Sequence, residues 1–96
     1  MNLSETLKTI RNIILALAES YGAKNVRIFG SAARGDFDQN SDIDFLVDME
    51  KGRSLFDMGG LLMELQKLLG CKVDIVTPKG LRPRIRDAVL KEAMTL

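Results

Sequence analysis

The chain has 96 residues, with 14 Lys and Arg against 13 Asp and Glu, which gives a formal net charge of +1. This length predicts a single domain over residues 1–96, and the near-neutral charge argues against direct binding to duplex nucleic acid, which usually needs a basic surface. There is no histidine and one cysteine, so a Ser–His or Cys–His catalytic pair is excluded. Any metal site must use oxygen ligands, which favours Mg²⁺, Mn²⁺ or Ca²⁺.

The single cysteine, Cys71, also bears on the compartment, because a secreted chain of this size would be expected to carry disulfides. The apolar run over residues 13–18 is too short for the core of a signal peptide or for a membrane span. The sequence therefore predicts a cytoplasmic protein with no membrane contact.

The predicted elements alternate between helices and strands along the chain. Apolar residues at spacings of three and four predict a helix over residues 4–20. A short β-prone run over 26–29 stops at Gly30, and the stretch 30–41, rich in Gly, Ser and Asp, predicts a loop with room for one helical turn. A second strand follows over 43–49, with alternate apolar residues on one face.

The second half of the chain continues this alternation. Ser54 is placed to cap a helix over 54–69, in which Gly59–Gly60 predicts a weak point where the helix bends or breaks. A third strand is predicted over 72–76 and a last helix over 83–94. Alternating elements of these lengths predict an α/β fold, an α+β sandwich in which helices pack against a small mixed sheet.

Three carboxylates fall on predicted strands or at the entrance to one, where their side chains face away from the core. Side chains alternate along a strand, so Asp42 and Asp44 share one side while Ile43 and Phe45 share the other. Neighbouring carboxylates repel each other unless a cation compensates, and hard divalent cations prefer carboxylate oxygens. The pair therefore predicts a metal site, against the alternative of a turn aspartate followed by an exposed strand residue. Asp74 likewise interrupts an apolar strand, and its alternative is a solvated strand face.

Another signal is the β-run that ends in Gly30-Ser31 at a predicted sharp turn. Backbone N–H groups can approach an anion closely at such a turn, and a helical turn through Arg34 would add a favourable dipole. The Ser31 hydroxyl can donate to a phosphate oxygen. The alternative is a plain turn, since Gly-Ser is a frequent turn dipeptide.

The combined pattern is more specific than its parts. Gly-Ser-Ala-Ala-Arg-Gly over residues 30–35, followed by Ser-Asp-Ile-Asp-Phe-Leu-Val over 41–47, resembles the signature of the minimal nucleotidyltransferases of the DNA polymerase β superfamily. Asp74 stands where that family has its third acidic residue, and residues 81–93 look like the family's C-terminal helix. The resemblance covers essentially the whole chain and implies a nucleotidyltransferase-like fold.

The resemblance also implies a set of site residues. The positions that would hold the triphosphate of ATP, the nucleotide donor, are Gly30, Ser31, Arg34 and Ser41. The catalytic positions that would coordinate two Mg²⁺ ions are Asp42, Asp44 and Asp74. Asp74 would serve as a ligand or as the general base for the attacking hydroxyl, and two metals suit an in-line displacement at phosphorus. For Arg34 the alternative is a surface ion pair with Asp36 or Asp38.

Stand-alone chains of this size resemble the antitoxin partners of HEPN-type toxins, which are small helical proteins. That resemblance implies Mg²⁺-dependent transfer of AMP from ATP to a tyrosine hydroxyl of the toxin. Two alternatives stay open: an interaction module that neutralises its partner by contact alone, and nucleotidyl transfer to a small molecule or an RNA end.

Two groups of residues have open roles at partner surfaces. Arg82, Arg84 and Arg86 crowd the first turn of the last predicted helix, where their charges oppose the helix dipole. They are candidates for contact with phosphate or a partner, and a solvated face is the alternative. Apolar positions of the 54–69 helix leave pairing with a second copy or with a partner open, with core packing as the alternative: Phe56, Met58, Leu61 and Met63.

Overall fold

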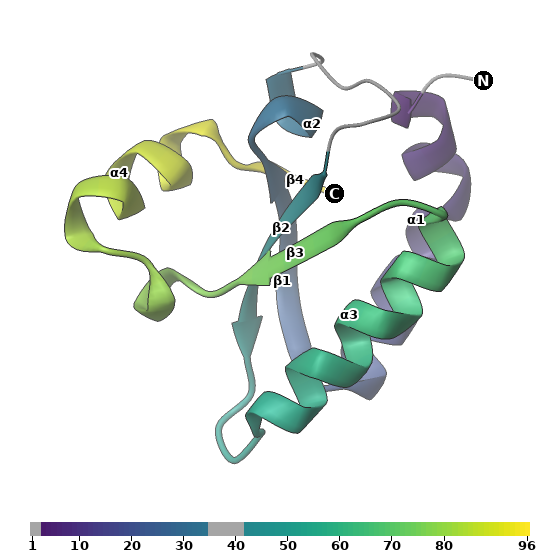
Figure 1. Cartoon of the computed structure of the whole chain (residues 1–96), viewed down its shortest axis with the longest axis horizontal. Coiled ribbons are helices and arrows are strands. Elements are labelled where there is room, and N and C mark those ends of the chain that lie inside the picture. The colour runs from purple at the N-terminus through teal and green to yellow at the C-terminus, as the bar shows by residue number, and fades with distance from the viewer. Residues whose placement is uncertain (1–2, 35–41) are drawn as a thin grey trace.

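The computed structural model describes residues 3–34 and 42–96, which form a four-stranded sheet with helices on both sides (Figure 1). In chain order the elements are α1 (Leu3–Ser20), β1 (Ala23–Phe29), α2 (Ser31–Arg34), β2 (Ile43–Met49), α3 (Leu55–Leu69), β3 (Val73–Val76), the 3-10 turn η1 (Pro78–Gly80), α4 (Pro83–Glu92) and β4 (Met94–Thr95). The predicted α/β fold, with helices packed against a small mixed sheet, is confirmed. No helix in the two described stretches is long and apolar enough to cross a membrane.

The strands lie in the order β3-β2-β1-β4. β1 pairs antiparallel with both β2 and β4, whereas β2 and β3 are parallel. Parallel neighbours need a crossover connection, and α3 provides it. Because β2 and β3 run in the same direction, their first residues lie at the same end of the sheet.

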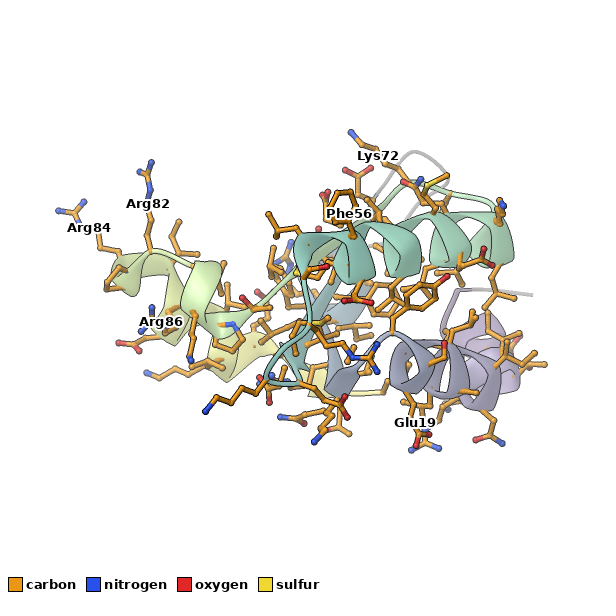
Figure 2. All side chains as sticks on the ribbon, turned by 90° about the horizontal axis from the view of Figure 1, so that it is seen from below. Glu19, Phe56, Lys72, Arg82, Arg84 and Arg86 are labelled. Carbon is orange, nitrogen blue, oxygen red and sulfur yellow. The ribbon has the colours of Figure 1, made fainter. Side chains whose placement is uncertain are left out.

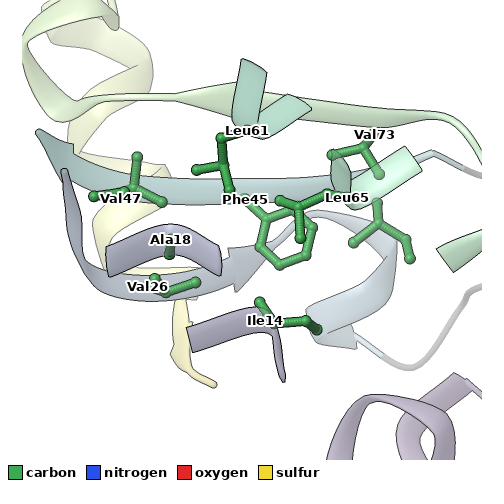
Figure 3. Close-up of a cluster of buried hydrophobic side chains, with 10 residues drawn as sticks. Ile14, Ala18, Val26, Phe45, Val47, Leu61, Leu65 and Val73 are labelled. Atoms are coloured by element: carbon green, nitrogen blue, oxygen red, sulfur yellow. The ribbon is translucent and has the colours of Figure 1, made fainter. Parts of the chain in front are cut away.

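One face of the sheet packs against α1 and α3, and α4 lies on the other side (Figure 1). The predicted apolar face of β2 is confirmed, since Ile43, Phe45 and Val47 are each no more than 1% exposed. Figure 3 shows this core, which also includes Ile14, Ala18, Val26, Leu61, Leu65 and Val73. Strand alternation therefore turns the carboxylates of β2 away from α1 and α3.

α3 runs unbroken through its glycine pair, so the expected break is absent. A Cβ atom at Gly60 would lie 2.5 Å from Cε1 of Tyr21. The missing side chain thus lets the Tyr21 ring, at the junction of α1 and β1, pack closely against α3. Gly60 therefore allows the contact between Tyr21 and α3, although glycine has a low helix propensity.

One strand begins earlier than predicted, and another strand was not predicted at all. β1 begins at Ala23, earlier than expected, and contains an irregularity between Lys24 and Arg27 where Asn25 adopts a φ of +50°. This irregularity interrupts the local alternation on which strand prediction depends. β4 was not predicted. The last helix, expected to reach residue 94, ends at Glu92, and β4 begins at Met94.

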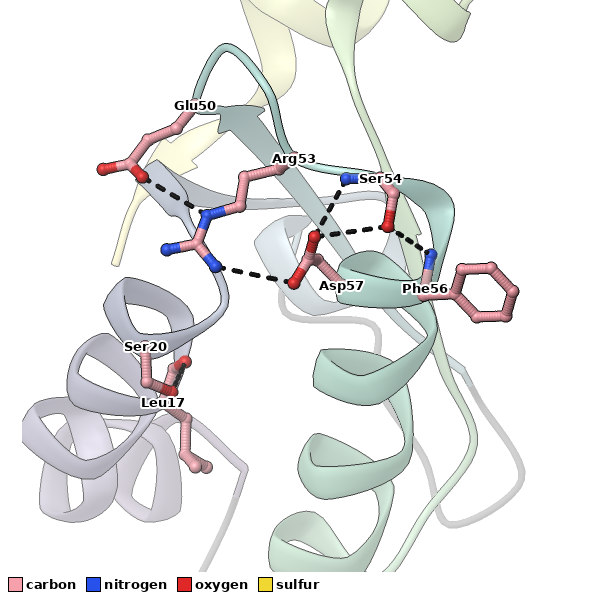
Figure 4. A network of polar contacts seen from close by, with 7 residues as sticks. All are labelled: Leu17, Ser20, Glu50, Arg53, Ser54, Phe56 and Asp57. Carbon is pink, nitrogen blue, oxygen red and sulfur yellow. Dashed lines mark hydrogen bonds and ion pairs between the residues drawn. The ribbon is translucent and has the colours of Figure 1, made fainter.

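The start of α3 is held by a network of polar contacts (Figure 4). Oγ of Ser54 accepts from the Phe56 N–H at 3.2 Å. Ser54 and Asp57 also form a capping box, in which the Ser54 side chain accepts from the Asp57 backbone and Oδ2 of Asp57 accepts from the Ser54 N–H at 2.9 Å. Arg53 adds ion pairs to Glu50 at 3.4 Å and to Asp57 at 3.5 Å. The predicted cap by Ser54 is confirmed.

Ser54→Ala is expected to lower the free energy of unfolding by about 1 kcal/mol, because an N–H group of the first turn loses its acceptor. Urea unfolding measures the change. Ser20→Ala is the control: its Oγ donates at 2.7 Å to the Leu17 carbonyl, which also accepts from the Tyr21 N–H. That variant should stay within about 0.5 kcal/mol of wild type, and equal losses for both would contradict the capping role.

Candidate active site

The three predicted carboxylates lie at one end of the sheet. Asp44 of β2 is the register partner of Asp74 on β3, and on its other side it pairs with Phe29, the last residue of β1. Asp42 lies two residues before Asp44 and shares its face by strand alternation. Gly30 directly follows Phe29, and the chain turns there. The structure therefore brings the carboxylates and the predicted phosphate-binding turn together.

Gly30 has the conformation that its closeness to Asp44 demands. Its φ is +70°, a left-handed conformation that glycine adopts easily and other residues rarely adopt. A Cβ atom at this position would lie 2.5 Å from Oδ2 of Asp44, so only glycine lets the turn pass this carboxylate. The Arg34 N–H then donates to the Gly30 carbonyl at 3.1 Å and closes α2, the expected helical turn.

Asp44 lies at the electrostatic centre of the group. Its pKa is raised above the ordinary value of 3.8, first because burial removes solvent from the carboxylate, and then because the charges of Asp74 and Asp42 repel it. Glu92 adds a further repulsion, and Arg34 opposes these effects. The carboxylates are therefore close enough to disfavour the ionised form of Asp44.

A divalent cation fits this set of residues by its chemistry. Carboxylate oxygens are the ligands that Mg²⁺ prefers, and a positive charge beside Asp44 would relieve the repulsion that raises its pKa. Within residues 3–34 and 42–96, no three acidic or cysteine side chains close into a ready-made metal cage. Besides Arg34, Lys72 lies beside these carboxylates, with its Nζ 4.0 Å from Oδ2 of Asp42.

Arg34 forms an ion pair that no sequence pattern predicted. Its Nη1 donates to Oε1 of Glu92, the last residue of α4 and 58 positions further along the chain. The partners expected in the alternative interpretation, Asp36 and Asp38, lie outside the described residues. One signal could have pointed to Glu92, because an acidic residue at the C-terminal end of a helix opposes the helix dipole unless a cation lies nearby.

The arginines at the start of α4 differ in their surroundings. Arg86 donates from Nε to the Pro78 carbonyl at 2.8 Å and from Nη2 to the Leu81 carbonyl at 3.2 Å. It therefore holds η1 against α4. Arg82 and Arg84 are exposed and extend away from the sheet (Figure 2), so they remain candidates for contact with a partner.

Three large apolar side chains of α3 face solvent, and Leu55 at the start of the helix is one of them at 83% exposed. Phe56 is 92% exposed and Met63 is 60% exposed, whereas Leu61 is fully buried. Figure 2 shows Phe56 on the outer side of the helix. Core packing, the alternative expected for this helix, therefore accounts for Leu61 and does not account for Phe56 or Met63.

A hollow of about 360 Å³ lies at the opposite end of β2. It is lined by Asp48 and Met49 of that strand and by residues 77–79. Because Asp42 and Asp44 are at the other end of β2, the hollow contains none of the predicted site residues.

Known families and proteins resemble this chain over most of its length. The family model for a nucleotidyltransferase domain matches residues 8–95. A protein of Methanocaldococcus jannaschii named as a protein adenylyltransferase is 39% identical over 98% of this chain and 97% of its own length. The protein adenylyltransferase MntA of Thermococcus cleftensis is 38% identical over 93% of this chain and 94% of its own length.

Solved structures share the fold. One described as a minimal nucleotidyltransferase has a TM-score of 0.90 at 49% identity and covers 100% of this chain and 97% of that one. A toxin–antitoxin structure with AMP-PNP contains a chain of the same fold, at a TM-score of 0.75 and 23% identity over 88% of this chain and 69% of that one. This chain belongs to the nucleotidyltransferase domain family and is an enzyme of that kind.

Proposed function

We propose that this protein, acting as one domain over residues 1–96, transfers AMP from Mg-ATP to a tyrosine hydroxyl of a small helical HEPN-type toxin, and so serves as a cytoplasmic antitoxin. Two relatives similar over nearly their whole length carry the name protein adenylyltransferase. The fold recurs in a toxin–antitoxin structure with the ATP analogue AMP-PNP. These findings support ATP as the donor and a protein hydroxyl as the acceptor.

The observation that carries the proposal is the alignment of Asp44 with Asp74 across two parallel strands, beside the Gly30 turn. Asp44 is half-buried between that turn and β3, while Asp74 is exposed. A nucleotide at the turn would present its phosphates to Asp44, and a hydroxyl arriving from solvent would reach Asp74. The donor and acceptor sides of the reaction thus fall on neighbouring strands.

The reaction is an in-line displacement at the α-phosphorus of ATP. The tyrosine oxygen bonds to that phosphorus, the bond from phosphorus to the bridging oxygen of the β-phosphate breaks, and diphosphate leaves with the electron pair. Asp74 takes the hydroxyl proton as general base, because its carboxylate is open to the acceptor. Two bound Mg²⁺ ions would supply Lewis-acid stabilisation to the entering and leaving oxygens, and Asp42 and Asp44 would hold them together with Asp74.

The triphosphate is held from the side of the turn. Gly30 brings backbone close to Asp44, the Ser31 hydroxyl donates to a phosphate oxygen, and Arg34 adds positive charge. Ser41, which lies outside the described residues, stays a prediction for the same role.

Intact-mass analysis of the protein encoded beside this one, the proposed toxin, tests the proposal. After incubation with this protein and Mg-ATP, we expect an added adenylyl group on the toxin. The addition should disappear when the acceptor tyrosine is replaced by Phe or when EDTA removes the metal. Neutralisation with no change in mass would instead support an antitoxin that acts by contact. Release of diphosphate with a small molecule or RNA alone would point to another acceptor.

A further inference from the structure

An ion pair joins the end of α2 to the end of α4 beside the proposed active site. Arg34 donates from Nη1 to Oε1 of Glu92, and the two side chains are 54% and 29% exposed. An ion pair this open to solvent adds little to folding stability. Its importance therefore lies in where it holds the guanidinium.

The C-terminal strand determines where Glu92 lies. β4 pairs with β1 through Met94 opposite Ile28, and the Leu96 N–H donates to the Val26 carbonyl at 3.1 Å. Continuing this antiparallel register brings the residues just before β4 alongside the end of β1, where α2 begins. The backbone hydrogen bonds between β4 and β1 thus place Glu92 next to the proposed site.

The site lies close to both residues. Extending the β1–β4 register by two residues puts Glu92 alongside Gly30, whose turn passes close to Oδ2 of Asp44. A carboxylate at this position would repel a triphosphate unless a cation covered it. Arg34 covers it, and Glu92 in return fixes the direction of the long Arg34 side chain.

We propose that Glu92 is a positioning residue that holds the Arg34 guanidinium against the phosphates of the bound nucleotide. The inference rests on the proposed function, because it requires a triphosphate at the Gly30–Ser31 turn. A guanidinium carries five N–H donors in a rigid fork, so Arg34 can keep Nη1 on Glu92 and direct other donors at phosphate oxygens. Without Glu92, the Arg34 side chain loses this anchor, and its contacts with phosphate carry a larger ordering cost.

A double-mutant cycle tests this role through nucleotide affinity. The full chain is titrated calorimetrically with AMP-PNP in Mg²⁺ buffer as wild type, Glu92→Asp, Arg34→Ala and the double variant. Glu92→Asp keeps the negative charge but retracts the carboxylate, so the repulsion stays while the ion pair is lost. We expect this change to weaken binding about tenfold in the wild-type background and less than about twofold with Arg34→Ala.

The matched control is Glu64→Asp, because Glu64 forms a similarly exposed ion pair with Lys67 at 3.9 Å on α3; affinity should not change. Unfolding midpoints should stay at the wild-type value in all variants. Equal losses from Glu92→Asp in both backgrounds, or no loss in either, would overturn the positioning role. If the wild-type chain binds AMP-PNP but leaves the toxin unmodified, the proposed acceptor is refuted and the double-mutant cycle can still be interpreted. If it binds no nucleotide, both the proposed function and the positioning role of Glu92 are refuted.

Discussion

Asp44→Asn is expected to abolish AMP transfer and, in the absence of divalent cations, to make the fold more stable. Asparagine keeps the shape of the side chain but cannot supply the anionic oxygen that a divalent cation prefers. Losing metal assistance worth several kcal/mol predicts a fall in the transfer rate of about 10³-fold or more.

The stability effect follows from the raised pKa of Asp44. Burial, and then the charges of Asp74 and Asp42, disfavour its ionised form in the folded protein. A carboxyl with a raised pKa stabilises the fold fully below its ordinary pKa of 3.8, and this contribution is lost as the pH rises through the folded-state pKa. At neutral pH, wild type therefore carries a destabilising ionised carboxylate that the Asp44→Asn variant lacks. The two proteins should converge in stability as the pH falls.

Label transfer from radiolabelled ATP to the toxin measures the first effect, and urea unfolding in EDTA over a pH series measures the second. Added Mg²⁺ should then stabilise wild type more than the Asp44→Asn variant. Asp87→Asn is the control, because Asp87 is an exposed aspartate of α4 and is not one of the three carboxylates of the proposed site. Both the transfer rate and the stability should stay at wild-type values. An Asp44→Asn variant less stable than wild type at neutral pH would contradict the repulsion argument, whatever its activity.

The three carboxylates show which parts of the candidate site a sequence pattern can predict. Alternation along residues 43–47 predicted a buried Phe45 and an Asp44 turned away from the core, and Phe45 is fully buried. This prediction succeeds because residues two apart on a strand always share a face. No such local rule says which strand lies beside β2, yet its parallel pairing with β3 is what brings Asp74 to Asp44.

Contacts between distant segments escaped prediction for the same reason. β4 has two residues, too few for any periodicity, and it forms because β1 presents an edge with unpaired backbone groups. Glu92, the partner of Arg34, lies two residues before that strand. From the sequence, Gly60 is a weak point in a helix, and only the tertiary structure reveals that Tyr21 packs against it.

Gly30→Ala is expected to lower both stability and activity, with the larger effect on activity. At a φ of +70°, a residue with a Cβ atom is strained by about 1 kcal/mol. The added atom would also lie 2.5 Å from Oδ2 of Asp44, so the carboxylate or the turn must move. A misplacement of roughly 1 Å can lower an enzyme's rate by about 10²-fold, and we expect a loss of this size in AMP transfer.

Gly70→Ala separates backbone strain from the collision with Asp44. Gly70 has a φ of +67°, close to that of Gly30, but nothing lies within 4 Å of a Cβ atom placed there. It should therefore show a similar loss in the free energy of unfolding and keep wild-type transfer. Urea unfolding and label transfer on both variants give the comparison. If both variants transferred AMP equally well, catalysis would not need the close approach of the Gly30 turn to Asp44, and the nucleotide would have to bind elsewhere.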